Sequence, residues 1–310
     1  MVMKAGILGY SEGNGHPFSF SAIINGYDPD AFIAAGWPVI LNYLENQPRD
    51  AFDFHDLEVT CAWTQDKNLT QKLCAASKIT YALDHYEEMI GKVDLVFIAR
   101  DDYQTHYKIA KPFLEYGIPV FIDKPLTLNN DELSYFEKYL NNGLLMSTSG
   151  MRYAQELDLI RNNELDLGEL KLVEGVVLNN LEKYGIHLLD AMNGLGLSKV
   201  ISATRLPGPF EFYSLILENN VVFNLTCLGK VGKTFHLSFY GTNNHYHYDL
   251  HDNFTAFKRT IQNMQLMVKN KMPVILPYET INTMQLIRQL SSLKPMERIV
   301  FKTKEGAAIV

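Results

Sequence analysis

The stretch that most constrains the fold is residues 93–127, where two apolar runs flank a helical pattern and lead to Lys124. Residues 93–99 are almost continuously apolar, as is typical of a strand that is buried on both faces of a parallel sheet. Residues 105–116 predict the connecting helix, and residues 118–122 predict the next strand. Open α/β sheets bind their ligands at the carboxyl ends of the strands. We therefore expect Lys124, within Asp-Lys-Pro, at that edge of the sheet.

The same alternation of strand and helix begins at the amino terminus. Residues 4–9 form a short apolar strand, and residues 57–63 form a second one that precedes a helical pattern at 66–77. Such alternation predicts an α/β fold with a parallel sheet and right-handed crossovers. We therefore predict a Rossmann-like dinucleotide-binding domain over residues 1–125. It carries an insertion at about residues 26–56, longer than the roughly 2–6 residues usual for such a link. The insertion would lie near the ligand mouth or decorate the domain edge.

A glycine-rich loop follows the first strand and precedes a predicted helix. Backbone N–H groups at such a helix start can bind a phosphate. Gly9 fits the first glycine of the dinucleotide fingerprint, whereas Ser11 stands where the second is expected. A Cβ at that position hinders the approach of a pyrophosphate, so a plain tight turn is an equal alternative. The candidate cofactor contacts of this loop are Gly9, Tyr10, Ser11, Gly13, Asn14 and Gly15.

The end of the second strand bears on the choice between NAD and NADP. NAD-preferring Rossmann domains commonly place an acidic residue there to bind the ribose hydroxyls. In this chain the position falls at Trp63 or Thr64, and Asp66 comes two or three residues too late. Both cofactors therefore stay open, with Thr64 as the candidate contact.

Composition and charge argue against several classes of protein. A net charge of −7 over 310 residues argues against nucleic-acid binding, which is built on basic surfaces. No apolar run reaches the roughly 18 residues of a membrane-spanning helix, and the amino terminus lacks the pattern of a signal peptide. The three cysteines show no zinc-type spacing, which favours reduced, buried thiols. We therefore expect a cytoplasmic protein with no membrane or nucleic-acid partner.

Four short motifs occur in an order that is typical of one protein family. They lie at residues 98–106 (Ile-Ala-Arg-Asp-Asp-Tyr-Gln-Thr-His), 121–126 (Phe-Ile-Asp-Lys-Pro-Leu), 150–153 (Gly-Met-Arg-Tyr) and 184–190 (Tyr-Gly-Ile-His-Leu-Leu-Asp). With them the chain resembles the Gfo/Idh/MocA family of NAD(P)-dependent sugar and polyol oxidoreductases over nearly its whole length. The resemblance implies that residues 126–310 form a substrate-binding and oligomerisation α/β domain on an open, mostly antiparallel sheet. Strand and turn patterns between residues 170 and 244 agree with this.

The resemblance also implies roles for single residues. Hydride transfer from a carbinol needs a proton acceptor and a group that stabilises the developing alkoxide. Lys124 is implied as the catalytic cation and His187 as the acid/base, since imidazole titrates nearest neutral pH. Asp190 would bind a substrate hydroxyl or orient the imidazole. The other implied contacts are Arg152 and Tyr184 for the substrate, and Thr64, Arg100, His106, Asp123 and Lys124 for the cofactor, NAD or NADP.

These roles have plainer alternatives. A strand-end lysine is usually a solvated charge, and a half-buried histidine is often satisfied by a helix neighbour. Many dehydrogenases of the family carry an aspartate four residues before the histidine, where this chain has Lys183. Glu182 and Tyr184 would face elsewhere on a regular helix.

Two functional hypotheses follow. The leading one is an NAD(P)-dependent oxidoreductase acting on a small polyhydroxylated substrate (a sugar, sugar derivative or polyol), assembled as a homo-oligomer, dimer or tetramer, through the C-terminal sheet. The alternative, motivated by Lys183 and the irregular glycine loop, is a non-catalytic dinucleotide-binding or regulatory protein that keeps the fold.

A histidine-rich stretch offers a rival site. On a strand, four side chains that can ligate a metal would share one face: His245, His247, Asp249 and His251. Ligands along one extended strand are spaced by roughly 6–7 Å per pair, too far apart to converge on one ion. We therefore expect a polar sheet face here and no metal.

Overall fold

The computed structural model describes residues 2–52 and 54–301. Asp53 of the predicted insertion and residues 302–310 of the predicted second domain lie outside the described residues. The chain forms two compact units. Unit 1 holds the described residues up to Thr148 together with Phe257–Ile281, and unit 2 holds Ser149–Ala256 together with the described residues from Asn282 on.

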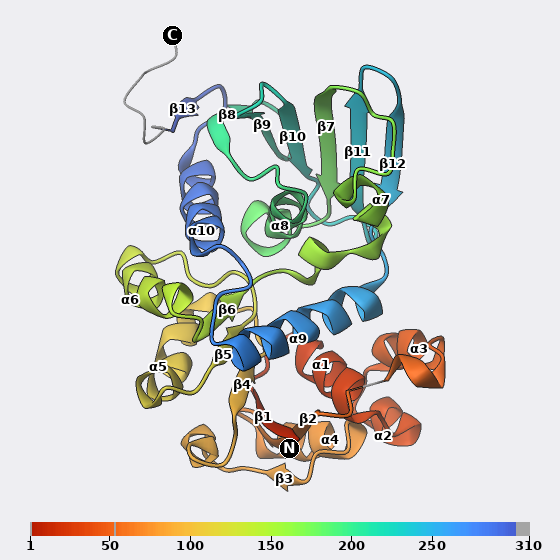
Figure 1. The fold of residues 1–310 in the computed structure, drawn as a ribbon, viewed down its shortest axis with the longest axis vertical. Coiled ribbons are helices and arrows are strands. Elements are labelled where there is room, and N and C mark those ends of the chain that lie inside the picture. The colour runs from red at the N-terminus through yellow and green to blue at the C-terminus, as the bar shows by residue number, and fades with distance from the viewer. Residues whose placement is uncertain (1, 53, 302–310) are drawn as a thin grey trace. The chain divides into compact units, whose positions relative to one another are not determined.

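The described part of unit 1 is built on a six-stranded parallel sheet in the order β3-β2-β1-β4-β5-β6 (Figure 1). Its strands are β1 (Met3–Leu8), β2 (Leu57–Trp63), β3 (Tyr81–Ala82), β4 (Leu95–Ile98), β5 (Val120–Ile122) and β6 (Leu145–Ser147). Every residue of β4 and β5 is buried, which explains their continuous apolar sequence. The strand order reverses between β1 and β4, so the loops after these two strands leave neighbouring strand ends. The predicted Rossmann-like sheet is confirmed.

Helices connect the strands of unit 1. They are α1 (His16–Asn25), α2 (Pro29–Ala34), α3 (Pro38–Glu45), α4 (Lys67–Ala76), α5 (His106–Tyr116) and α6 (Asn130–Asn141), with short 3-10 turns at Arg49–Ala51, Tyr86–Met89 and Tyr103–Thr105. Helices α2 and α3 lie within the predicted insertion. Most of α9 (Asn253–Asn270) and the first turn of α10 (Pro277–Ser292) also belong to this unit.

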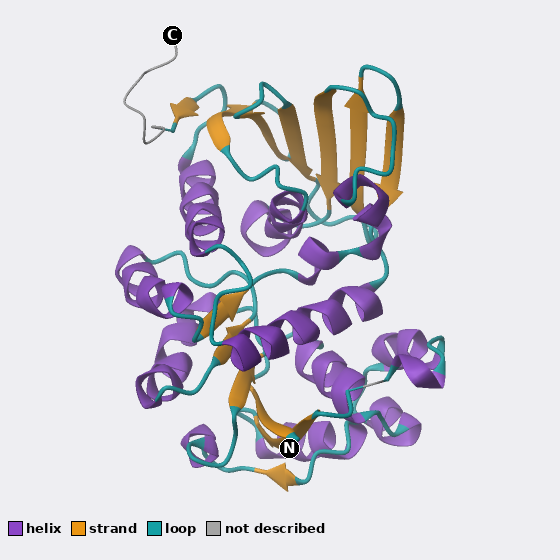
Figure 2. Ribbon diagram, in the orientation of Figure 1, coloured by secondary structure: helices purple, strands orange, loops and turns teal. Residues whose placement is uncertain are grey.

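The described part of unit 2 is built on a seven-stranded mixed sheet in the order β12-β11-β7-β10-β9-β8-β13 (Figure 2). Its strands are β7 (Leu170–Val177), β8 (Val200–Leu206), β9 (Glu211–Leu217), β10 (Val222–Cys227), β11 (Phe235–Gly241), β12 (His245–Asp249) and β13 (Arg298–Val300). Strands β7 and β10 pair in parallel and the other pairs are antiparallel. The predicted mostly antiparallel sheet is therefore confirmed.

Helix α8 (Ile186–Gly194) covers one face of this sheet. A Cβ built on Gly175 of β7 would lie 3.1 Å from Cδ1 of Leu188, so the helix packs directly on the strand. Along β9 and β10 buried and half-buried residues alternate, as expected for a sheet with one covered and one open face. The remaining helical pieces are α7 (Asp158–Arg161), the later turns of α10, the 3-10 turns η4 (Gly150–Tyr153) and η5 (Gln155–Leu157), and the π-helical turn η6 (Leu181–Gly185).

Within the described ranges, none of the helices combines the length and the apolar character that crossing a membrane requires.

Candidate functional site

Two glycines give the loop between β1 and α1 its shape. Gly9 and Gly13 have φ angles of +81° and +78°, in the left-handed region that glycine adopts without strain. A Cβ on Gly9 would lie 2.5 Å from Cδ of Arg100, so the buried arginine side chain lies directly against the loop. The Arg100 guanidinium is held in turn by Asp102, with Nε 2.5 Å from Oδ1 and a second bond from Nη2 to Oδ2.

The side chain of Ser11 is turned towards the end of β4. Its hydroxyl donates to Oδ1 of Asp101 at 2.6 Å and accepts the Asp101 N–H at 3.1 Å. On the other side of the loop, the Gln65 side chain pairs with both backbone groups of Tyr10: the Tyr10 N–H donates to Oε1 at 3.3 Å, and Nε2 donates to the carbonyl oxygen. Gln65 directly follows Thr64 after β2 and was not among the predicted cofactor contacts.

Thr64, the expected ribose contact, forms hydrogen bonds with residues at the start of α4. Its N–H donates to Oγ1 of Thr70 at 2.9 Å, and its hydroxyl donates to the carbonyl oxygen of Asp66 at 2.7 Å. Asp66 caps the helix, since its Oδ1 accepts the N–H of Leu69 at 2.9 Å. Both polar side chains at this strand end therefore satisfy local backbone and side-chain groups.

A buried carboxylate joins the glycine loop to Asp-Lys-Pro. Oδ2 of Asp123 accepts from Nδ2 of Asn14 at 3.0 Å and lies 2.5 Å from Nδ1 of His16, the first residue of α1. Burial raises the pKa of Asp123, but the charges of His16 and Lys124 and the hydrogen bonds from His16 and Asn14 outweigh it, so the pKa lies well below its ordinary value. His16 was not among the expected contacts. The signal that could have identified it is a histidine directly after Gly15, the last glycine of the loop.

Lys124 is buried, with only 3% of its surface exposed. Its Nζ lies 3.9 Å from Oδ2 of Asp101, and its N–H donates to Oδ1 of Asp123 at 2.9 Å. The following bond to Pro125 is cis. The lysine is therefore held beside two carboxylates at the carboxyl end of β5 and is not a solvated surface charge.

His106 lies fully buried between two loops. Its Nδ1 lies 2.9 Å from the carbonyl oxygen of Leu126, after β5, and its Nε2 lies 2.8 Å from that of Arg100, after β4. Burial lowers the pKa of His106 below its ordinary value, and the two carbonyl contacts oppose this only in part. His106 therefore links the loops that follow β4 and β5, which carry Arg100 and Lys124.

The insertion packs against the glycine loop through Trp37. The Trp37 and Tyr10 rings meet edge to face at 6.3 Å between centroids. A Cβ on Gly15 would lie 2.8 Å from a Trp37 ring carbon and 2.4 Å from Cδ1 of Ile40. Gly15 is therefore needed for close packing of the insertion, which lies beside the loop expected to hold the cofactor.

Within unit 2, His187 and Asp190 both contact Ser149. Nδ1 of His187 lies 2.5 Å from the Ser149 hydroxyl, and Oδ2 of Asp190 accepts the Ser149 N–H at 2.6 Å. The His187 ring packs between the rings of Tyr184 and Phe235, at 5.6 and 5.3 Å between centroids. Ser149 was not expected from the sequence, although a serine directly before Gly-Met-Arg-Tyr fits the N-cap position that it occupies in η4.

The turn before α8 is not a regular helix. In η6 the N–H of Gly185 bonds the carbonyl of Asn180 at 3.0 Å, a π-helical span of five residues. The Tyr184 ring, three residues before His187, contacts the imidazole. Lys183 is exposed, and its N–H is bound by Oδ1 of Asn180 at 2.9 Å.

Arg152, an expected substrate contact, is half-buried, and its backbone lies against Arg161 and Gly194. Its carbonyl oxygen accepts from Nη2 of Arg161 at 3.0 Å. The same oxygen would lie 2.3 Å from a Cβ on Gly194, at the end of α8. These contacts fix the start of unit 2 against the far end of the helix that carries His187.

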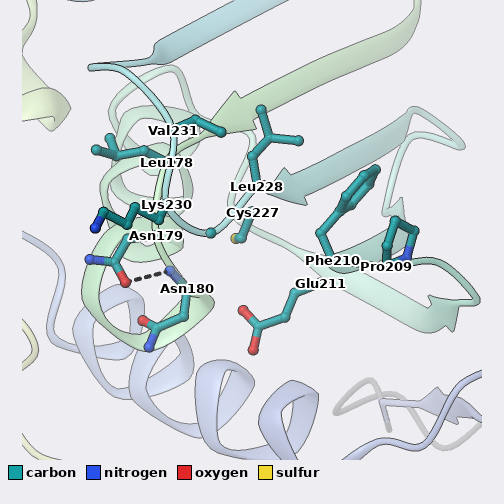
Figure 3. Close-up of a pocket in the computed structure, with 11 residues that line it drawn as sticks. Leu178, Asn179, Asn180, Pro209, Phe210, Glu211, Cys227, Leu228, Lys230 and Val231 are labelled. Carbon is teal, nitrogen blue, oxygen red and sulfur yellow. Dashed lines mark hydrogen bonds between the residues drawn. The ribbon is translucent and has the colours of Figure 1, made fainter.

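A pocket of about 560 Å³ lies in unit 2 beside η6 (Figure 3). It is lined by Leu178, Asn179, Asn180, Pro209, Phe210, Glu211, Cys227, Leu228, Gly229, Lys230 and Val231. Oε2 of Glu211 accepts the N–H of Leu181 at 2.6 Å, so one wall of the pocket holds the first residue of η6. Burial raises the pKa of the Cys227 thiol, whose sulfur would lie 3.2 Å from a Cβ on Gly185. The pocket thus borders the turn that leads into His187.

The histidine-rich stretch forms part of the sheet in unit 2. His245, His247 and Asp249 lie on β12, and His251 follows it. The Ser238 hydroxyl lies 2.7 Å from Nε2 of His236 and 2.8 Å from Nδ1 of His247, so it bridges two imidazoles. Among the residues that the structure describes, no group of three or more His, Cys, Asp or Glu side chains is placed to hold a metal ion.

Comparison with known proteins finds a family match within unit 1. Residues 38–141 match the Gfo/Idh/MocA family model, described as an oxidoreductase family with an NAD-binding Rossmann fold. The match includes Lys124 and begins after the glycine loop. A protein of Amycolatopsis mediterranei (strain S699), named as a UDP-kanosamine synthase oxidoreductase subunit, is 29% identical over 119 residues. That match covers 38% of this chain and spans only 33% of the relative's length.

Solved structures share the fold over nearly the whole chain. Myo-inositol 2-dehydrogenase from Lactobacillus plantarum superposes with a TM-score of 0.75 at 13% identity, covering 97% of this chain and 100% of that one. Myo-inositol dehydrogenase from Lactobacillus casei, solved with NAD(H) and myo-inositol, has a TM-score of 0.72 at 13% identity and covers 99% of both chains. Scyllo-inositol dehydrogenase from the same organism, solved with NAD(H) and scyllo-inositol, has a TM-score of 0.70 at 12% identity, covering 93% of this chain and 95% of that one.

Proposed function

We propose that the chain is an NAD(P)-dependent oxidoreductase of the Gfo/Idh/MocA family, whose model matches residues 38–141. It transfers a hydride between nicotinamide and a carbinol or carbonyl group of a sugar, sugar derivative or polyol. The observation that carries the proposal is the buried Lys124 at the carboxyl end of β5. The inositol dehydrogenases that share the fold, solved with NAD(H) and a polyol, support the class of substrate.

The burial of Lys124 is the strongest chemical signal in unit 1. An ammonium group is costly to bury unless it is paired. A carboxylate oxygen of Asp101 lies 3.9 Å from Nζ of Lys124, and the charge of Asp123 also interacts with that of the lysine. A fold that maintains a cation at the ligand-binding edge of a parallel sheet is suited to stabilise negative charge there. Lys124 would donate a hydrogen bond to the reacting oxygen and favour its alkoxide form.

The loop after β1 fits a dinucleotide. The N-cap of α1 is Gly15, which has no side chain to cap the helix. The N–H of His16 donates to Oδ1 of Asn14 at 2.8 Å and Pro17 has no N–H, so the next N–H of the first turn, that of Phe18, would be the one to bind a phosphate. Among the described residues, no atom lies within 4 Å of a Cβ built on Gly13. The cofactor, NAD or NADP, would supply the hydride chemistry. Gly9, Gly13 and the first turn of α1 would hold its phosphates, and Arg100 would pack against the loop beneath them.

In unit 2, His187 is the proposed acid/base. Its imidazole is the type of group that exchanges protons near neutral pH, and its Nδ1 is already engaged by Ser149. Tyr184 lies against the imidazole and is a proposed substrate contact, together with Arg152 and Asp190. The pocket beside η6 would take a substituent of the substrate, because its walls mix Phe210 and other apolar groups with asparagine and charged side chains.

Cofactor binding followed by turnover tests this proposal. The chain is titrated with NAD(H) and NADP(H), and then assayed on a panel of inositols, other polyols and nucleotide sugars. Lys124→Met should lower turnover roughly 10²-fold or more, the range for loss of one alkoxide-stabilising donor, while the exposed Lys108→Met makes the same charge change and should leave it unaltered. Failure to bind any of the four nucleotides would contradict the proposal.

A non-catalytic dinucleotide-binding protein is the second candidate. The observation that favours it is Lys183, an exposed residue that stands where many relatives carry an aspartate. This candidate expects nucleotide binding without turnover across the whole panel. It also expects Lys124→Met to alter nucleotide affinity alone.

We further propose self-association through the open face of the sheet in unit 2. Apolar side chains such as Phe212, Ile216 and Val222 are only half-buried there. Light scattering during gel filtration measures the subunit number, and a monomer at micromolar concentration would contradict this part of the proposal.

A further inference from the structure

Ser149 is held at two points by the helix that carries His187. Its N–H donates to Oδ2 of Asp190 at 2.6 Å, and its hydroxyl lies 2.5 Å from Nδ1 of His187. His187 and Asp190 are three residues apart and therefore share one face of α8. We infer that Ser149 is a positioning residue that orients the His187 imidazole through Nδ1, so that proton exchange with a substrate runs through Nε2. The inference rests on the proposed role of His187 as the acid/base.

The hydroxyl of Ser149 is itself fixed in place. Ser149 is 1% exposed and is the N-cap of η4, where its Oγ accepts the N–H of Met151 at 3.1 Å. A rotation of the side chain away from His187 would therefore break the cap as well as the contact with the imidazole. A rigid partner of this kind restricts the imidazole to one orientation.

The contact extends along the same face of α8. Nδ2 of Asn193 donates to Oδ1 of Asp190 at 3.3 Å and to Oγ1 of Thr283 at 2.9 Å. Asp190 is thus bound at both oxygens, one by Ser149 and one by Asn193. Its carboxylate fixes the Ser149 backbone, and so acts on the imidazole indirectly.

Two aromatic rings set the plane of the imidazole. The Tyr184 and Phe235 rings lie at 65° and 82° to it, with centroids 5.6 and 5.3 Å away. With Nδ1 facing Ser149 and the ring flanked in this way, a flip that exchanged the two nitrogens would lose the hydrogen bond to the serine.

The serine also affects which nitrogen carries the proton. A hydroxyl has one hydrogen to donate and two lone pairs to accept with, and the Met151 N–H takes one of the lone pairs. When Nδ1 carries a proton, the second lone pair of Oγ accepts it, and Nε2 of the neutral ring has the lone pair that a base needs. When His187 takes up a proton at Nε2, the Nδ1–H bond to Ser149 is kept. The proton is thus gained and lost at Nε2 while the contact at Nδ1 persists.

The test reads the tautomer directly and needs no substrate. The full chain is labelled with ¹⁵N-histidine, and His187→Gln assigns the His187 signals among the nine histidines. We take Oγ of Ser149 as the acceptor of this bond, so in the neutral ring of the wild type we expect the proton mainly on Nδ1. Ser149→Ala should at least halve that fraction, and Ser149→Thr, which keeps the hydroxyl, should recover most of it. Unchanged ¹⁵N shifts in a folded Ser149→Ala chain would overturn the inference.

Ser149→Cys covers the case in which the alanine variant does not fold. Cysteine keeps the shape of the side chain and is a weak hydrogen-bonding group, so it should also lower the Nδ1–H fraction. If it leaves the fraction unchanged, the serine has only a packing role and the inference fails. Because these measurements involve neither cofactor nor turnover, their outcome is separate from that of the proposed function.

Kinetics gives a second measurement once a substrate is found. Ser149→Ala should lower kcat roughly 10- to 100-fold, as expected for a misplaced catalytic group, with little change in KM, and should alter the pH profile of kcat. Ser149→Thr should restore the profile. A fall in stability with kcat and its pH profile unchanged would contradict a positioning role.

Discussion

Nδ1 of His16 lies 2.5 Å from Oδ2 of Asp123, a contact between residues 107 apart that ties the first turn of α1 to the end of β5. The same carboxylate receives the Asn14 side chain and, at its other oxygen, the N–H of Lys124. The glycine loop and the candidate catalytic lysine are therefore positioned by one buried charge.

Asp123→Asn should destabilise the protein by about 3–5 kcal/mol, because it removes one partner of a buried charge pair and leaves His16 and Lys124 beside a neutral amide. Urea unfolding measures the change in the free energy of unfolding. The control is Asp84→Asn, which breaks the exposed pair with Lys67 and should leave the unfolding midpoint nearly unchanged. Equal midpoint shifts for the two variants would contradict the structural role of Asp123.

The contribution of Asp123 to stability should depend on pH. Its pKa in the folded chain lies below the ordinary value of 3.8, so the unfolded chain takes up the proton first as the pH falls. The contribution is fully present above about pH 4 and is lost as the pH falls towards the folded-state pKa. The difference in unfolding free energy between wild type and Asp123→Asn should thus be smaller at pH 3 than at pH 5. A difference that grows on acidification would contradict a folded-state pKa of Asp123 below the unfolded value.

His106→Leu should cost roughly 1–3 kcal/mol. Burial favours the neutral imidazole, which has one N–H, so one of the carbonyl groups of Arg100 and Leu126 would lose a buried hydrogen-bond donor. Chemical denaturation measures the loss, and His251→Leu is the matched control because its side chain is 75% exposed. If the buried and exposed variants have the same stability, the contacts of His106 with the loops after β4 and β5 do not stabilise the fold.

Substitution of Gly13 and of Gly15 by alanine should destabilise the protein for different reasons. Gly15 has an ordinary φ of −88°, so Gly15→Ala meets only the Trp37 and Ile40 side chains and should cost about 1–3 kcal/mol as an overpacked contact. Gly13→Ala should cost about 1 kcal/mol from its positive φ alone. In a double-mutant cycle with Trp37→Leu, Gly15→Ala should show coupling of at least about 0.5 kcal/mol and Gly13→Ala should not.

The parallel sheet could be predicted because its pattern is local. The apolar runs of β4 and β5 reflect burial on both faces, and a helix between two parallel strands brings their carboxyl ends to one edge. That is enough to place Lys124 where the structure has it. The expectation of two domains around sheets of different type came from the order of four motifs, and the observed sheets agree with it.

The side-chain pairs of the candidate site lie beyond such patterns. His16 and Asp123 meet across 107 residues and Ser149 and His187 across 38, and a hydrogen bond of this kind leaves no periodic trace in the sequence. Gln65 contacts Tyr10 only because β1 and β2 are neighbours in the sheet. Their residue types were visible, but their partners depend on strand order and on side-chain orientation.

The π-helical turn η6 affects how this chain should be aligned with others. Its hydrogen bonds span five residues, from Gly185 back to Asn180, where a regular helix spans four. The residues four and five positions before His187 therefore do not lie where a regular helix would place them. Glu182, five residues before His187, therefore belongs beside Lys183 in any comparison with the aspartate that many relatives carry before this histidine.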